Sequence, residues 1–190
     1  MPATRIVVAC EQCGAFWDPA AERAVCTDAS HDHRRFDSHL HRSRVAFPDG
    51  TEVTAASFGS ADPYAREVDP DFGLYLDERW QPPWPHDHLD WPDYGVPDDR
   101  ARVVAELESL RERARSGQRV EIGCYGGHGR TGTALACLAV LAGTPADAAV
   151  AWVRANYCPK AVETDTQEQL VATFRPSVGA EGLEPPTTAL

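Results

Sequence analysis

A cysteine and an arginine stand six positions apart in a glycine-rich stretch, Cys124 and Arg130, directly after a short predicted strand at residues 119–123. A strand, a glycine-rich turn and a helix in this order direct several backbone N–H groups and the positive end of the helix dipole toward one point. That arrangement binds a dianionic phosphate, and the same field stabilises a thiolate. Arg130 can donate two hydrogen bonds to phosphate oxygens, a geometry that lysine does not reproduce. The alternative interpretation is a glycine-rich turn with a buried structural cysteine.

A second stretch, Trp-Pro-Asp-Tyr-Gly-Val-Pro at residues 91–97, precedes Cys124 and is bounded by proline and glycine. When a thiolate attacks phosphorus in line, an acid must protonate the departing oxygen. Asp93, on a loop that can close, is a suitable donor. Taken alone, Asp93 could be an ordinary turn residue after proline, but its combination with a Cys-x5-Arg stretch favours the catalytic interpretation.

The two stretches together resemble the cysteine-dependent protein tyrosine phosphatase superfamily. The stretch at 91–97 resembles the tyrosine-specific branch, whereas the Cys-Tyr-Gly-Gly-x-Gly-Arg sequence and the small size of the chain resemble the dual-specificity branch. The resemblance covers about residues 73–174 and implies an α/β fold with a mixed sheet flanked by helices. It implies hydrolysis of phosphotyrosine in a phosphorylated protein or peptide, with phosphoserine and phosphothreonine left open as further substrates.

The resemblance also implies a role for each matching residue. Cys124 would form a cysteinyl-phosphate, Thr131 would assist release of the thiolate, and Asp93 would act first as acid and then as base. Gln167 matches a glutamine that positions the hydrolytic water, with helix capping as the alternative. No metal or other cofactor is implied for the reaction. The phosphate would be held by Arg130 and by the backbone amides of Tyr125, Gly126, Gly127, His128, Gly129 and Arg130.

Two positions depart from the family pattern. Gly123 stands where the family usually has a histidine before the nucleophile, and Glu163 stands where the tyrosine-specific branch has its first glutamine. The first departure removes a side chain that tunes the thiolate, and the second replaces an amide with a carboxylate. Both keep an alternative function open, in which the domain is a phosphoprotein-binding pseudophosphatase or adaptor module.

A cluster of cysteines and histidines near the N-terminus has metal-ligand spacing. Cys10, Cys13, Cys26 and His31 form a Cys-x2-Cys-x12-Cys-x4-His pattern, with His33 as an alternative fourth ligand. A Cys-x2-Cys-Gly turn has the geometry of a zinc knuckle. Because residues 1–35 contain few apolar anchors, a structural zinc ion would supply folding energy. The alternative is a set of reduced cysteines beside a surface run of histidines.

Composition limits the class of protein. The chain has 190 residues, of which 43% are hydrophobic and 25% charged, the balance of a soluble globular protein. Its net charge is −11, and residues 61–100 contain eleven acids against three arginines. This charge disfavours binding to nucleic acid or to an anionic membrane surface. No apolar run is long enough to span a bilayer and no secretion signal is recognised, so we expect a cytoplasmic protein with reduced cysteines.

These residues require a particular order of elements. We predict a zinc-knuckle-like module at 1–35, a β-hairpin and connector at 36–72, a catalytic domain at 73–175 and a disordered tail at 176–190. Hydrophobic periodicity and turn residues predict the strands and helices. The predicted strands are 5–9, 43–47, 51–58, 73–76 and 119–123; the predicted helices start at Asp98 or Asp99, at 134, after Thr144 and at Thr164 or Thr166.

Overall fold

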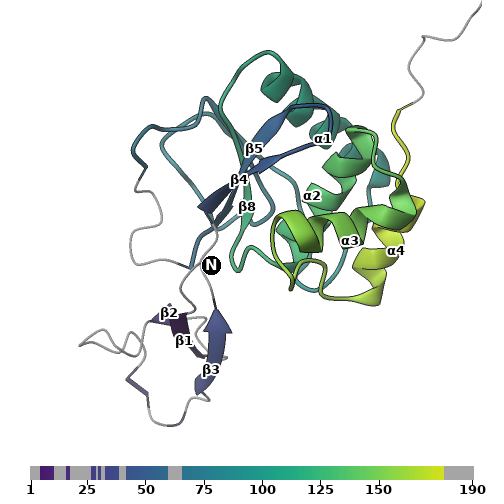
Figure 1. Ribbon diagram of the computed structural model, residues 1–190. Helices are drawn as coiled ribbons and strands as arrows, with labels where there is room; N and C mark the ends of the chain where they lie inside the picture. The colour runs from purple at the N-terminus through teal and green to yellow at the C-terminus, as the bar shows by residue number, and fades with distance from the viewer. Residues whose placement is uncertain are drawn as a thin grey trace, which may run out of the picture.

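The computed structural model describes residues 5–10, 16–17, 27–28, 30, 33–38, 42–59 and 66–177. Within these ranges the chain forms two separate β-sheets and a group of α-helices (Figure 1). The smaller sheet has the order β2-β1-β3, and both pairs of strands are antiparallel. Its strands are β1 (Arg5–Cys10), β2 (Phe16–Trp17) and β3 (His33–Ser38). The predicted boundary at residue 35 falls inside β3, because pairing with β1 extends that strand to Ser38.

The larger sheet has five strands in the order β4-β5-β8-β6-β7. Strands β5, β8, β6 and β7 are parallel, and β4 forms an antiparallel hairpin with β5 at one edge. The mixed sheet predicted from the sequence is therefore confirmed. Its strands are β4 (Arg42–Ala46), β5 (Glu52–Ser57), β6 (Phe72–Tyr75), β7 (His86–His88) and β8 (Val120–Cys124).

Four helices follow the strands in the described part of the chain: α1 (Arg100–Arg115), α2 (Gly129–Leu141), α3 (Ala146–Asn156) and α4 (Asp165–Thr173). The Asp99 side chain caps α1 by accepting a hydrogen bond from the amide of Arg102, and Thr164 caps α4 in the same way. The start predicted for the third helix is wrong by one residue, because Pro145 and not Thr144 occupies the capping position. None of the helices in these ranges has both the length and the apolar character needed to cross a bilayer.

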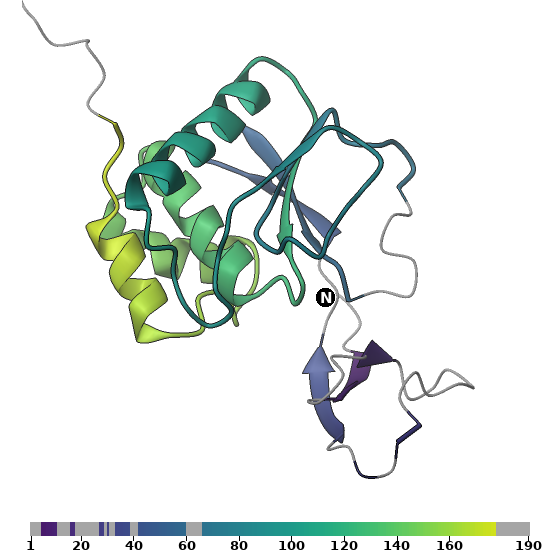
Figure 2. The same ribbon diagram turned by 180° about the vertical axis from the view of Figure 1, so that it is seen from behind.

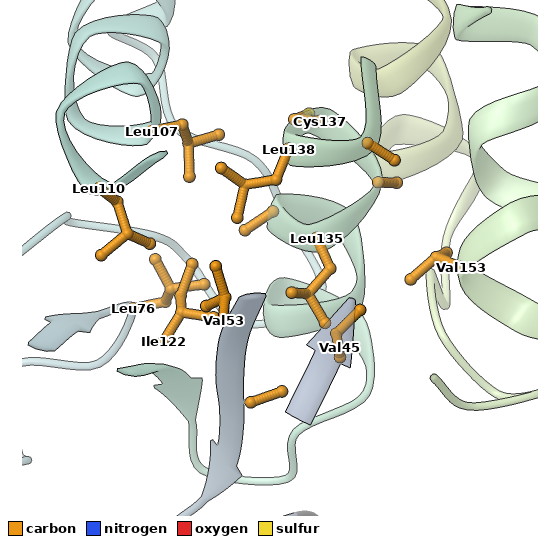
Figure 3. Packing of buried hydrophobic residues seen from close by; sticks show 14 of the residues in the cluster. Val45, Val53, Leu76, Leu107, Leu110, Ile122, Leu135, Cys137, Leu138 and Val153 are labelled. Atoms are coloured by element: carbon orange, nitrogen blue, oxygen red, sulfur yellow. The ribbon is translucent and has the colours of Figure 1, made fainter. Parts of the chain in front are cut away.

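The helices cover one face of the larger sheet, as the two opposite views show (Figure 1, Figure 2). Alternate residues of the strands, such as Val53 and Ile122, meet leucines of α1 and α2 in the main core (Figure 3). On the other face, a smaller core covers the sheet in place of a helix layer. It consists of Ala56, Phe58, Tyr75, Trp80 and Trp84.

The topology brings distant segments to one edge of the sheet. The parallel strands β5, β6 and β8 end at Ser57, Tyr75 and Cys124, and the carboxyl ends of parallel strands lie at the same edge. Ligand sites of open α/β sheets form at this edge, in the loops that follow the strands. The candidate site therefore lies in the loops after β6, β7 and β8.

Candidate active site

Cys124 is the last residue of β8, and its thiol faces the loop that follows. The side chain is almost fully buried, yet its Sγ atom has two polar partners. The backbone N–H of Gly127 donates to Sγ over 3.3 Å, and the Thr131 hydroxyl donates over 3.1 Å. In both hydrogen bonds the sulfur is the acceptor. The structure therefore brings Thr131 to the predicted nucleophile.

The loop from Tyr125 to His128 leads directly into α2. This helix begins at Gly129, earlier than the predicted start at residue 134, because residues 129–133 are buried but carry no large apolar side chain that a hydrophobic pattern would register. Gly127 has a φ of +76°, a conformation that favours glycine. The loop thus curls from β8 into the N-terminal turn of α2, and the amides of the predicted phosphate-binding residues lie at that turn.

Arg130 connects this loop to two others. Its buried guanidinium donates through one nitrogen to the carbonyl of Leu76 over 3.1 Å and to that of Trp91 over 3.4 Å. Its other terminal nitrogen lies 3.3 Å from a carboxylate oxygen of Asp77 and 3.3 Å from one of Asp93. One guanidinium in the first turn of α2 therefore contacts the segments after β6 and β7 at once.

Asp93 is held by a folded loop whose anchor is Trp91. The Trp91 ring is buried in the main core, and its Nε1 donates to the carbonyl of Gly95 over 2.9 Å. Asp93 itself stays accessible, with 67% of its side chain exposed. The predicted acid is therefore open to solvent and lies 3.3 Å from the Arg130 guanidinium.

Gln167 lies behind this loop and is fully buried. Its Oε1 accepts a hydrogen bond from the backbone N–H of Glu163 over 2.8 Å, and its Nε2 donates to the carbonyl of Gly95 over 3.4 Å. The side chain therefore joins the segment before α4 to the loop that carries Asp93. Its handling of a hydrolytic water stays a prediction.

Glu163 lies beside the phosphate-binding loop. The backbone N–H of Gly129 hydrogen-bonds to its carboxylate. Partial burial, followed by the negative charge of Asp93, raises the pKa of Glu163 above its ordinary value, although the Gly129 amide and Arg130 oppose this. The Glu163 carboxylate therefore accepts a hydrogen bond from the Gly129 amide, one of the amides predicted from the sequence to bind phosphate.

Two contributors, Asp77 and Arg79, were missed by sequence reasoning. Asp77 is buried and accepts hydrogen bonds from the Arg79 guanidinium over 2.6 and 2.8 Å, while also contacting Arg130. Burial would raise the pKa of Asp77, but Arg79 and the charge of Arg130 outweigh it and lower that pKa. Arg79 also lies 5.1 Å from the ring centre of Tyr125. The sequence signal that could have identified Asp77 is an acid directly after the buried strand predicted at residues 73–76.

The predicted zinc ligands are only partly within the described residues. Cys10 ends β1 and His33 begins β3, and these two residues are Cα partners in the antiparallel pair. Cys13, Cys26 and His31 lie outside the described residues. Among the side chains that the structure does describe, no three histidines, cysteines or acids are grouped as metal ligands.

Known proteins resemble this chain in sequence and in fold. A family model described as "Swiss Army Knife protein, DSP-PTPase phosphatase domain" matches residues 79–176. Two uncharacterized proteins of Methanocaldococcus jannaschii are 35% and 34% identical over 113 residues, covering 53% of this chain and 74% and 68% of theirs. The crystal structure of Tk-PTP in the active form is 28% identical with a TM-score of 0.56, covering 67% of this chain and 92% of that chain. Kinase associated phosphatase has the same fold at 18% identity, with a TM-score of 0.58 over 72% of this chain and 94% of that chain.

Proposed function

The chain belongs to the family of DSP-PTPase phosphatase domains, and from that premise we propose that it hydrolyses phosphotyrosine in proteins through a cysteinyl-phosphate. The observation that carries the proposal is the environment of Cys124. Its sulfur accepts hydrogen bonds from the Gly127 amide and the Thr131 hydroxyl, with Arg130 six residues further on in contact with Asp93. Phosphoserine and phosphothreonine are further substrates if their shorter side chains let the phosphate reach the Cys124 sulfur.

In the first step, the Cys124 thiolate attacks phosphorus and the bond between phosphorus and the ester oxygen breaks. Asp93, in its protonated form, gives its proton to the departing oxygen, so that tyrosine leaves as a neutral phenol. Arg130 turns from its carboxylate partners to the equatorial oxygens, where charge develops. The amides at the start of α2 hold the same oxygens.

In the second step, a water molecule attacks the phosphorus of the cysteinyl-phosphate. Asp93, now ionised, accepts a proton from this water, and the sulfur–phosphorus bond breaks. The hydrogen bonds from Thr131 and Gly127 stabilise the departing thiolate. Inorganic phosphate leaves, and the site returns to its starting protonation.

The test is turnover of a phosphotyrosine peptide by the intact chain. Cys124→Ser should abolish phosphate release, because an alcohol at this position is not ionised at neutral pH. Asp93→Asn should lower kcat by about 10²- to 10⁴-fold, the usual contribution of a general acid. Asp87→Asn is the matched control, because Asp87 belongs to the same acidic stretch but is exposed on β7.

A second function, capture of phosphoproteins without turnover, is favoured by the Glu163 carboxylate beside the loop amides. Micromolar binding of the phosphopeptide with no phosphate release by the wild-type chain would support capture and reject the enzyme. Equal phosphate release by the wild type and Cys124→Ser would reject the nucleophile.

A further inference from the structure

The residue directly after α3 contacts the loop that is predicted to bind phosphate. Tyr157 follows α3, and its hydroxyl donates to the backbone carbonyl of Gly127 over 2.6 Å. Gly127 is the residue whose own N–H donates to the Cys124 sulfur over 3.3 Å. One hydroxyl, 30 residues further along the chain, is therefore bonded to the same residue that solvates the nucleophile.

The orientation of the Gly127 carbonyl determines whether an N–H or a C=O group points into the loop. A peptide unit is planar and trans, so its C=O and N–H point in opposite directions. While the Gly127 carbonyl points to Tyr157, the N–H of His128 in the same unit points the other way. If this unit turned over, a carbonyl oxygen would replace an N–H in a loop that must bind a thiolate and a phosphate.

The backbone of this peptide unit is conformationally permissive on its Gly127 side. Gly126 and Gly127 lack side chains, and Gly127 adopts a φ of +76°. The Tyr157 hydroxyl adds a restraint from outside the loop through its hydrogen bond to the Gly127 carbonyl.

Tyr157 is itself fixed. Its backbone N–H bonds to the carbonyl of Val153 over 2.9 Å, and its ring packs against the main core. Burial, with the nearby sulfurs of Cys124 and Cys158, raises the pKa of Tyr157 well above its ordinary value. The hydroxyl consequently remains a donor across the range in which phosphatases work.

We propose that Tyr157 is a positioning residue for the reaction at Cys124, whose hydroxyl holds the Gly127 carbonyl away from the cradle so that the loop amides face the sulfur and the phosphate. This inference rests on the proposed function for its relevance to turnover. It concerns the state of Cys124, however, and that state is measurable without any substrate.

The experiment compares the wild type with Tyr157→Phe, which removes only the hydroxyl. The rate of iodoacetamide alkylation at Cys124 is followed against pH by mass spectrometry of the peptide that contains it. We expect alkylation at neutral pH to slow and kcat/KM on a phosphotyrosine peptide to fall, each by about tenfold, the effect of one hydrogen bond. In the Cys124→Ser background, Tyr157→Phe should weaken the binding of inorganic phosphate.

The matched control is Tyr75→Phe. Tyr75 is a buried tyrosine of the smaller core whose hydroxyl donates to Glu121 over 3.0 Å and accepts from Trp84 over 2.6 Å. This variant should lower the melting temperature and leave the alkylation profile and kcat/KM unchanged.

Three results would overturn the proposal: an alkylation profile in Tyr157→Phe that matches the wild type, an equal change in Tyr75→Phe, or a Tyr157→Phe chain that does not fold. In the last case the hydroxyl serves the fold and not the loop. A wild type without turnover would reject the proposed function, and the alkylation and phosphate-binding comparisons would still decide the role of Tyr157.

Discussion

Gly123, the residue before the predicted nucleophile, lies in a part of the sheet that leaves no room for a side chain. A Cβ atom at Gly123 would lie 2.5 Å from the carbonyl oxygen of Ala56 and 2.9 Å from the Phe58 ring. The face of β8 at this point is covered by the smaller core, which packs against the backbone. A side chain at this position would require both the Ala56 backbone and the Phe58 ring to move. The polar contacts to the Cys124 sulfur come instead from Gly127 and Thr131.

The first prediction for a single residue concerns Glu163. Its carboxylate occupies the Gly129 amide and adds a negative charge beside a dianionic substrate. We expect Glu163→Gln to lower KM for a phosphotyrosine peptide several-fold with little change in kcat, measured by steady-state kinetics. Because the pKa of Glu163 is raised on folding, the ionised form destabilises the native state at neutral pH. The variant should therefore raise the melting temperature more at pH 7 than at pH 4.

Glu168→Gln is the control for this substitution. Glu168 lies on α4, close to Glu163 in sequence, and pairs with Arg154 over 2.8 Å instead of with the loop. It should leave KM unchanged. A fall of kcat by more than about tenfold in Glu163→Gln would contradict the prediction and assign proton or water handling to Glu163 itself.

Asp77 gives the second prediction. One of its oxygens lies 2.6 Å from Arg79 and 3.3 Å from Arg130, so it fixes both guanidiniums at the edge of the site. We expect Asp77→Asn to reduce kcat/KM by about ten- to a hundredfold, the equivalent of a charge-assisted hydrogen bond of about 1.5–3 kcal/mol. The pKa of Asp77 is lowered on folding, so its ionised form stabilises the native state above the ordinary carboxyl range. The difference in melting temperature between wild type and variant should shrink as the pH falls below about 4.

Asp71→Asn is the control for Asp77→Asn. It removes an ion pair elsewhere in the fold and so tests whether the loss of kcat/KM is specific to Asp77. Asp71 bonds to Arg119 over 2.7 Å, and hydrogen bonds from Arg119 lower its pKa to about 2. The pair lies at the amino ends of β6 and β8, opposite the edge that carries the site. A loss of kcat/KM in Asp71→Asn equal to that in Asp77→Asn would contradict a specific role for Asp77.

At the scale of the elements, the sequence predicted those whose signals are local. The hairpin β4–β5, the strands β6 and β8 and the helices α1, α3 and α4 follow from alternation, helical periodicity and capping residues. Strand β7 was missed because residues 86–88 have no apolar pattern. They form a strand only by pairing with β6, a tertiary contact that the local sequence does not encode. The contact of Tyr157 with Gly127 was also missed, because it depends on how α3 packs beside α2 and no spacing in the sequence encodes it.

The small sheet gives the third prediction, which concerns the zinc site expected from the sequence. The register of β1 and β3 brings the backbones of Cys10 and His33 side by side, and this favours His33 over His31 as a ligand. We expect about one zinc ion per chain in elemental analysis of the purified protein, with loss in Cys10→Ser and His33→Ala. His31→Ala should retain the metal.

Cys137→Ser is the control for the cysteine change. Cys137 is fully buried on α2, and burial raises the pKa of its thiol, so it is a poor metal ligand. A chain that folds without metal after chelation, or that keeps its zinc in His33→Ala but loses it in His31→Ala, would contradict this ligand set.

The whole molecule brings four segments far apart in sequence to one edge of a sheet. The residues after β6, the loop at 91–97, the loop before α2 and the segment before α4 all contact one another through Arg130 and Gln167. The sequence identified three of these segments by motif. It did not identify the segment after β6, because Asp77 acts through arginines that only the folded sheet brings to it.

The net charge of the molecule gives the last prediction. The chain carries −11, and residues 61–100, which include Asp93, contain eleven acids. The field of such a surface slows the approach of anionic substrates and speeds that of cationic ones, and added salt screens both effects. We expect kcat/KM for a phosphotyrosine peptide with acidic flanking residues to rise as the salt concentration increases, and that for a peptide with basic flanking residues to fall. A peptide with neutral flanking residues serves as the control and should change least. The same dependence for all three peptides would show that local contacts at Arg79 and Arg130, and not the field of the whole chain, select the substrate.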